Sequence, residues 1–189
     1  MKGKYYFKGL TKMIGKESVS FFKYCIRMSG FIDVSYSKWI NRESPLGGKR
    51  LMYKTGTLMR SIRISEVNEE RVVIESDTPY SVIHNEGGAI TVTMQMKKYW
   101  WAMYYNFTEK IKKTEKGKVA KTKSNQKISA KAEFCKRMAL MKVGSKIKIP
   151  KRQYIGESQQ LMRKIEYMFF ENHIPEIENV IFKKNNDLK

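Results

Sequence analysis

The sequence is poor in the residues that most often carry metal or nucleophilic chemistry. It contains two cysteines, Cys25 and Cys135, and two histidines, His84 and His173. A standard four-ligand zinc site would need all four residues to converge, so the sequence predicts no metal site. Both cysteines lie in apolar, helix-like surroundings, which favours buried free thiols in a reducing cytoplasm over the alternative of a single disulfide.

Long apolar runs and acidic residues are also scarce. No apolar run approaches the roughly 18 residues that a membrane-spanning helix needs, so the sequence predicts no membrane partner. Lys and Arg number 38 and Asp and Glu number 18, which gives a formal net charge of +20. Such a chain is attracted to polyanions or to acidic protein surfaces, and the charge alone does not choose between them.

The patterning predicts an α+β fold over residues 1–189 as a single domain, with or without an appendage. The expected features are an N-terminal helix, a small mostly antiparallel sheet with a β-hairpin, a C-terminal helix and a Lys-rich inserted loop. Apolar residues at three- and four-residue steps predict helices over residues 4–29, 96–107, 132–143 and 157–170, the last with Ser158 as its N-cap. Alternating patterns predict strands over residues 58–67, 71–77, 89–95 and 146–149. Pro175 either interrupts the helical pattern or starts a second helix that carries Ile177 and Ile181.

The inserted loop is predicted over residues 108–131. This segment holds nine lysines against Glu109 and Glu115, a balance of +7, and almost no large apolar residues. A solvated, mobile loop is the physical expectation for such a composition. The alternative is a contact for DNA phosphates or an acidic partner. The candidate contact residues are Lys110, Lys112, Lys113, Lys116, Lys118, Lys121 and Lys123.

An aromatic run precedes this loop. Trp100, Tyr104 and Phe107 fall on one face of the predicted helix, which favours their packing against the core or a neighbouring subunit. The alternative is a surface on which the bases of single-stranded nucleic acid stack beside the lysines.

No residue pattern predicts catalysis. His84 lies beside Glu86, but adjacent side chains in one short turn usually diverge, so His84 is expected to fix a turn or contact a neighbouring subunit. His173 is expected at a helix junction. Gly87-Gly88 lacks the spacing of a phosphate-binding loop or a dinucleotide fold. The sequence therefore predicts no enzyme, no catalytic residue and no cofactor.

Three short segments marked by Gly and Pro carry the strongest pattern in the chain. They are Lys54–Leu58, Pro79–Gly88 and Ile149–Gly156. Their Gly and Pro residues are expected to set the backbone conformation of turns, because Gly permits positive φ and Pro fixes φ. In order and content, together with Trp39, they resemble the tailed-phage virion morphogenesis family, also described as tail-completion, neck or head–tail joining proteins.

The resemblance covers most of the chain. The matching residues are Trp39, then Thr55, Gly56, Leu58, Arg60, Ser61 and Ile62, then Tyr80, His84, Gly87 and Gly88, and finally Pro150, Arg152, Tyr154 and Gly156. The long segment from Met96 to Ser145 departs from the family pattern, in which this region varies.

The resemblance implies a non-catalytic structural protein of the virion, assembled in the host cytoplasm. Its expected partners are further copies of itself in a ring, most simply six, and the neighbouring neck and tail proteins, with DNA passing through the lumen. The candidate subunit-interface residues are Tyr80, His84, Asn85, Glu86, Gly87, Gly88, Arg152, Tyr154 and Gly156. The alternative function is a basic nucleic-acid-binding protein that uses the Lys-rich loop and the aromatic run.

Overall fold

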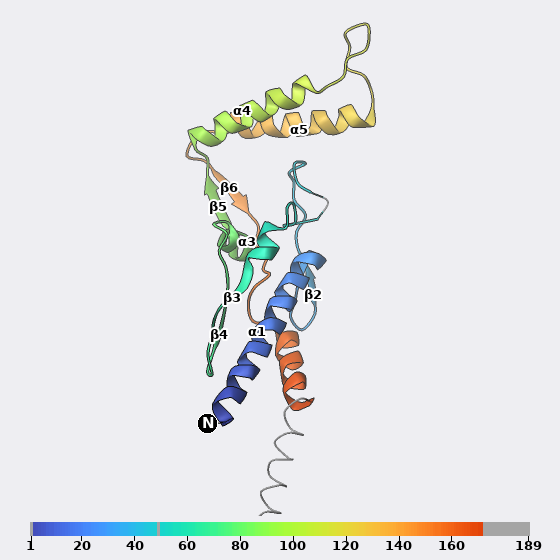
Figure 1. Ribbon diagram of the computed structural model, residues 1–189. Coiled ribbons are helices and arrows are strands. Elements are labelled where there is room, and N and C mark those ends of the chain that lie inside the picture. The colour runs from blue at the N-terminus through green and yellow to red at the C-terminus, as the bar shows by residue number, and fades with distance from the viewer. Residues whose placement is uncertain (1, 49, 172–189) are drawn as a thin grey trace, which may run out of the picture. The chain divides into compact units, whose positions relative to one another are not determined.

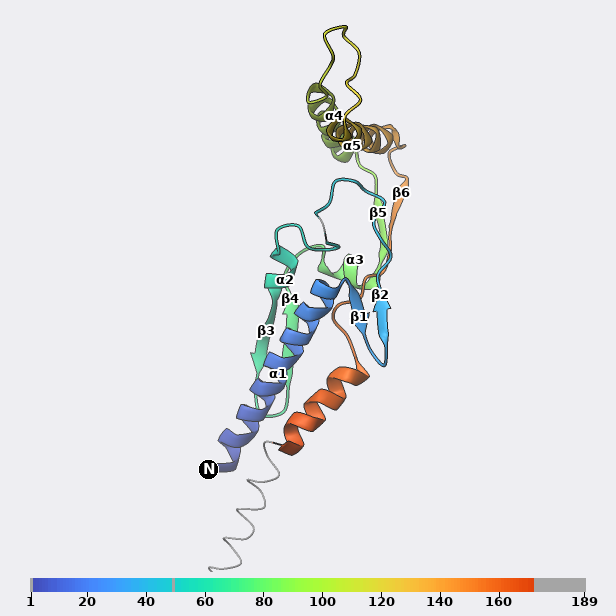
Figure 2. The ribbon, with the colours of Figure 1, turned by 90° about the vertical axis from the view of Figure 1, so that its right-hand side faces the viewer.

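The computed structural model describes residues 2–48 and 50–171, with backbone alone for residues 2–8 (Figures 1 and 2). The chain divides into two compact units. Unit 1 comprises Met1–Trp39, Thr55–Ser81 and Arg152–Lys189, and unit 2 comprises Ile40–Lys54 and Val82–Lys151. The chain therefore leaves unit 1 twice and returns to it twice.

In unit 1 a long helix packs on a β-hairpin. Helix α1 (Lys2–Met28) contacts strands β3 (Ile62–Val67) and β4 (Val72–Ser76), which pair antiparallel. Gly15 lies at this contact, where an added Cβ would stand 2.6 Å from Val72 Cγ2 and 2.8 Å from Ile64 Cδ1. This residue lowers the helix propensity of the segment, but it allows α1 to approach the hairpin closely.

Two further short elements belong to unit 1. Strands β1 (Gly30–Ile32) and β2 (Tyr36–Lys38) form a second antiparallel hairpin directly after α1. Helix α2 (Thr57–Ser61) occupies residues that the alternating pattern assigns to a strand. The strand prediction was wrong there because Gly56, at φ +78°, begins a helical turn in which Leu58 and Ser61 are both buried.

The C-terminal helix of unit 1 runs from residue 159 to residue 171, the last residue described. The predicted N-cap is confirmed, since Ser158 Oγ accepts a hydrogen bond from the backbone N–H of Leu161 at 3.1 Å. The same hydroxyl donates to the carbonyl of Ile32 at 2.8 Å. Asp33 Oδ1 accepts from the N–H of Gln159 at 2.8 Å, so both caps tie the helix start to the β1–β2 hairpin.

Unit 2 contains a β-ribbon and a helical hairpin. After α3 (Ser81–Glu86), strand β5 (Gly88–Thr91) pairs antiparallel with β6 (Lys146–Ile149). Helices α4 (Met94–Glu109) and α5 (Lys123–Leu140) follow β5 and lie side by side (Figure 1). The predicted third strand ends at Thr91 rather than residue 95, because Thr93 caps α4 by accepting from the N–H of Met96.

The Lys-rich segment is not a loop throughout residues 108–131, which corrects the sequence prediction. Helix α4 continues to Glu109, and α5 already begins at Lys123. Thr122 caps α5 by accepting from the N–H of Asn125 at 3.1 Å. The composition of residues 123–131 is polar enough to resemble a solvated loop, but these residues form the first turns of a helix whose buried residues Ala132, Cys135 and Ala139 follow them. The remaining loop joins the ends of α4 and α5 that lie away from β5 and β6 (Figure 1).

The α+β class is confirmed, with an N-terminal and a C-terminal helix. Across residues 2–48 and 50–171 the named strands form three two-stranded antiparallel sheets. Cys25 and Cys135 are buried free thiols, as the sequence predicts, and burial raises the pKa of each. His173 and the segment at Pro175 lie outside the described residues.

We expect Ser158→Ala to lower the free energy of unfolding by about 1 to 2 kcal/mol, because it removes a helix cap and a second hydrogen bond to Ile32. Chemical denaturation monitored by circular dichroism measures this loss. The control is Ser124→Ala, an exposed position in the first turn of α5. Equal stability of the two variants would contradict the structural role of the Ser158 cap.

Candidate functional site

Three of the four segments that carry the family resemblance are joined in unit 1 by two long-range hydrogen bonds. Trp39 Nε1 donates to the carbonyl of Gln153 at 2.9 Å, and Tyr154 Oη donates to the carbonyl of Ser81 at 3.3 Å. Trp39 and Tyr154 are both buried, and Tyr154 is only 1% exposed. These bonds bring together the Trp39 segment, the segment at Ser81 and the Pro-x-Arg-x-Tyr segment.

Tyr154 is held as a neutral phenol. Burial raises its pKa, and the side-chain hydrogen bonds with Ser76 and Ser81 oppose that rise. A buried phenol that donates to a main-chain carbonyl and contacts two serines is a structural group.

Arg152 and Tyr154 are not placed as a surface for a neighbouring subunit. Arg152 is 7% exposed and Tyr154 is 1% exposed, so both side chains lie inside the chain. Gly156 is half-buried. The sequence pattern does not distinguish an arginine and a tyrosine that support a fold from a pair that contacts a partner, and burial corrects this part of the expectation.

The other predicted interface residues lie in and around α3. Tyr80 in unit 1 is exposed, while His84 and Asn85 in unit 2 are half-buried. Glu86 is exposed, accepts from Asn85 Nδ2 at 2.5 Å and pairs with Lys151 Nζ at 3.7 Å. Of this group, the exposed Tyr80 and Glu86 are the side chains best placed to meet a partner.

Gly87 has a backbone role that no other residue type can fill easily. Its φ is +77°, and an added Cβ would stand 2.8 Å from the backbone nitrogen of Lys151. Gly88 follows with φ +152° and opens strand β5 opposite Ile149. The Gly-Gly pair thus starts the β5–β6 ribbon where the two backbones come close together.

The loop between α4 and α5, called here the lysine loop (residues 110–122), is held by one buried side chain. Asn125 is 2% exposed; its Nδ2 donates to the carbonyls of Lys112 at 2.8 Å and Ala120 at 2.7 Å. Its Oδ1 accepts from the N–H of Lys112 at 3.1 Å. All three bonds join the side chain to loop backbone, so Asn125 closes the base of the loop.

The tip of the lysine loop is a hydrogen-bonded turn. The N–H of Thr114 donates to the carbonyl of Lys118 at 2.7 Å, and the N–H of Gly117 donates back to the carbonyl of Thr114 at 2.8 Å. Gly117 takes the left-handed conformation that the turn requires, at φ +71°. Lys113 and Val119 form an antiparallel bridge between the tip and the base.

The predicted lysine contacts are all exposed. Lys123 lies in α5, and the others, Lys110, Lys112, Lys113, Lys116, Lys118 and Lys121, lie on the lysine loop. Unit 2 as a whole contains 21 Lys and Arg against 5 Asp and Glu, a balance of +16, whereas unit 1 contains 17 against 13, a balance of +4. Lys151 is the one lysine in the described part of unit 2 that forms an ion pair.

The aromatic run is used largely for packing within unit 2. Trp100 meets Phe134 of α5 edge to face, with ring centroids 5.8 Å apart, and Lys131 Nζ lies 5.8 Å from the centroid of Phe107. These contacts support the packing interpretation for Trp100 and Phe107, whereas the ring contacts of Tyr104 are with Trp101 and Tyr105 of the same helix. Tyr99 and Tyr105 remain exposed on α4.

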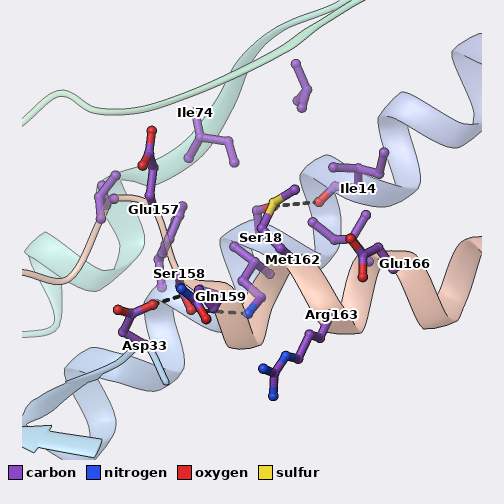
Figure 3. A pocket seen from close by; sticks show the side chains of 16 residues that line it. Ile14, Ser18, Asp33, Ile74, Glu157, Ser158, Gln159, Met162, Arg163 and Glu166 are labelled. Carbon is purple, nitrogen blue, oxygen red and sulfur yellow. Dashed lines mark hydrogen bonds between the residues drawn. The ribbon is translucent and has the colours of Figure 1, made fainter. Parts of the chain in front are cut away.

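Unit 1 has an apolar hollow of about 1100 Å³, lined by α1, β4 and residues 155–166. Figure 3 shows Ile14 from α1, Ile74 from β4 and Met162 from the C-terminal helix around it. Of its polar residues, Ser18 donates to the Ile14 carbonyl and Ser158 caps the helix, so both serines are engaged in the local structure. The charged residues Glu157, Arg163 and Glu166 also line the hollow.

A separate apolar patch, called here the α1–β2 patch, consists of Tyr24, Met28 and Tyr36. All three side chains are exposed. Tyr24 and Met28 are one turn apart on α1, and Tyr36 Oη donates to the carbonyl of Met28 at 2.8 Å. Contiguous exposed apolar side chains of this kind are typical of protein–protein contacts.

In residues 2–48 and 50–171, no group of three or more His, Cys, Asp or Glu side chains is arranged to hold a metal ion. None of the helices described there is long and apolar enough to cross a membrane.

No family model, curated protein or solved structure matches the chain.

The burial of Asn125 was not predicted from the sequence. An asparagine in a lysine-rich segment gives no sign of burial, and its role depends on loop carbonyls whose positions are set by the turn at Gly117. The Thr-x-x-Asn spacing from Thr122 is a weak signal for a helix start at this point.

We expect Gly87→Ala to destabilise the chain by about 2 kcal/mol or more, because it combines backbone strain with a clash against Lys151. The matched control is Gly144→Ala. Gly144 has φ +88° with open space around its Cα, so strain alone should cost about 1 kcal/mol there. Thermal and chemical denaturation of both variants gives the difference. Equal destabilisation would contradict a close approach at Gly87.

Proposed function

We propose that the chain is a structural component of a tailed-phage virion, a tail-completion or neck protein that forms a ring at the head–tail junction through protein–protein contacts. The observation that carries this proposal is the convergence of three of the four family-like segments in unit 1. Residues 39, 81, 153 and 154 come from distant parts of the sequence and are joined by two hydrogen bonds. Because these motif residues hold the fold together, they support a structural function in which the chain acts by its shape.

Exposed apolar surface on unit 1 supports an assembly role. A closed ring of identical subunits needs two different contact surfaces on each copy. The α1–β2 patch provides one apolar surface, and exposed Tyr80 and Glu86 provide candidate contacts elsewhere on the chain. Arg152 and Tyr154 are buried in unit 1 and support its fold.

A self-assembling ring predicts a discrete oligomer. Purified protein in moderate salt is expected to give a mass that is a fixed multiple of the 22.3 kDa chain, with six copies as the simplest number. Native mass spectrometry and light scattering measure this mass, and negative-stain images test for closed rings. A monomer at every concentration up to the solubility limit contradicts a self-assembling ring.

We expect the double variant Tyr24→Lys/Met28→Lys to weaken self-association at least tenfold, because it places two charges in an apolar contact. Leu140→Lys/Val143→Lys is the matched control, since it adds the same two charges at exposed apolar residues of unit 2. Both variants should keep the circular dichroism spectrum of the wild type. Unchanged association of the double variant would exclude the α1–β2 patch from the subunit interface.

The virion location has its own test. Tailed particles purified from cells that carry the gene should contain the chain in a fixed ratio to the other tail proteins. Quantitative mass spectrometry of such particles measures this ratio. Tailed particles that lack the chain contradict the proposed location.

A further inference from the structure

We propose that the lysine loop, together with the first turns of α5, is a preorganised contact for the phosphate backbone of double-stranded DNA. This inference goes beyond a ring held by protein–protein contacts. It assigns unit 2 a ligand of its own. The contact is electrostatic and independent of base sequence.

The internal hydrogen bonds of the lysine loop are the first observation in support of this contact. A lysine-rich insertion that only keeps a protein soluble needs no internal structure. Here three side-chain bonds from Asn125 close the base of the loop, and a turn at Gly117 fixes its tip. The loop therefore presents its ammonium groups from a fixed backbone, which lowers the entropy cost of binding a ligand.

The charge of the loop is uncompensated. Lys112, Lys113, Lys116, Lys118 and Lys121 are exposed, and none of them forms an ion pair with another described residue. Lys123 and Lys127 continue the positive surface one turn apart on α5. Several cations spread along a loop and a helix match a ligand whose negative charges repeat along its length.

The chemistry of the surface favours nucleic acid over an acidic protein. Protein interfaces have an apolar core from which lysine is depleted. The lysine loop offers one exposed large apolar side chain, Val119, among six lysines. A surface of this composition gains little from apolar burial and much from the release of counterions by phosphates.

The packing of the aromatic run favours duplex over single-stranded nucleic acid. Binding to single strands depends on aromatic faces on which bases stack. Trp100 and Phe107 contact Phe134 and Lys131 of α5, which leaves Tyr99 and Tyr105 as the large exposed aromatic side chains of α4. The phosphate backbone of a duplex needs no such stacking platform, since it presents its charges on the outside.

The test uses the full chain and a fluorescent DNA duplex of about 30 base pairs, with binding measured by anisotropy from about 50 to 200 mM salt. We expect Lys116→Gln/Lys118→Gln/Lys121→Gln to weaken binding at least tenfold at low salt. The slope of log K against log salt should become shallower by about 2.7, at about 0.9 for each phosphate that the variant no longer neutralises. The matched control is Lys12→Gln/Lys16→Gln/Lys38→Gln, which removes the same charge from exposed positions of unit 1.

The control should retain affinity within about threefold and keep the salt slope of the wild type. Equal weakening in the two triple variants would show that net charge alone attracts DNA, and it would overturn the assignment to the loop. Absence of duplex binding by the wild type at low salt would overturn the inference as a whole.

A second variant tests preorganisation at constant charge. Asn125→Ala should weaken duplex binding about three- to tenfold and expose the loop to trypsin. Gly117→Val, which strains the turn at φ +71° where the Cα faces open space, should act in the same direction even if Asn125→Ala fails to fold. Wild-type affinity in a folded variant whose loop has become trypsin-sensitive would contradict preorganisation.

Competition experiments with two other polyanions distinguish duplex DNA from single-stranded nucleic acid and from an acidic protein. A single-stranded oligonucleotide that binds more tightly than the duplex would favour base stacking and overturn the duplex assignment. Polyglutamate that displaces the duplex at equal charge concentration would favour an acidic protein partner instead. The mass of each variant is measured in the same buffers, so that failure to bind DNA with the oligomer intact counts against this inference alone.

Discussion

The hydrogen bonds made by Trp39 and Tyr154 are the constraint on which unit 1 depends. The Trp39 bond joins residues 114 apart in sequence, and the Tyr154 bond joins residues 73 apart. Trp39 and Ser81 are the residues at which the chain leaves unit 1, and Gln153 and Tyr154 follow directly on its last return. The bonds therefore fix the chain at the points where unit 2 is inserted. If Trp39 and Tyr154 were exposed polar residues, these two hydrogen bonds would be absent. The three segments would then have no direct link to one another.

The insertion separates two kinds of surface. Unit 1 has nearly balanced charge, a hairpin packed on α1 and exposed apolar side chains at Tyr24, Met28 and Tyr36. Unit 2 carries most of the net charge on a ribbon and a helical hairpin. An apolar contact on unit 1 strengthens as salt rises, whereas a phosphate contact on unit 2 weakens, so the salt dependence of binding distinguishes the two kinds of surface.

Sequence periodicity was sufficient for α1, the β3–β4 hairpin, β6 and the Ser158 cap, because these depend on patterns within one segment. It failed where a distant backbone decides the outcome. Arg152 and Tyr154 look like exposed functional residues in a Gly- and Pro-marked segment, and only the packing of unit 1 shows them to be buried. Asn125 likewise has no signal of its own, because the carbonyls that it bonds belong to Lys112 and Ala120 at the base of the loop. Local composition is a property of one segment, whereas the burial of a residue depends on the distant segments that pack against it.

The two proposals are connected through multivalency. A single lysine loop with a handful of phosphate contacts binds weakly at physiological salt, and weak contacts exchange quickly. A ring repeats the loop once per subunit, so several loops that reach one duplex act at a high effective concentration. Such a ring holds DNA without reading its sequence, while each separate contact releases fast enough for the duplex to move. Order in the loop matters most in this situation, because each copy that must first become ordered adds its own entropy cost to every binding event.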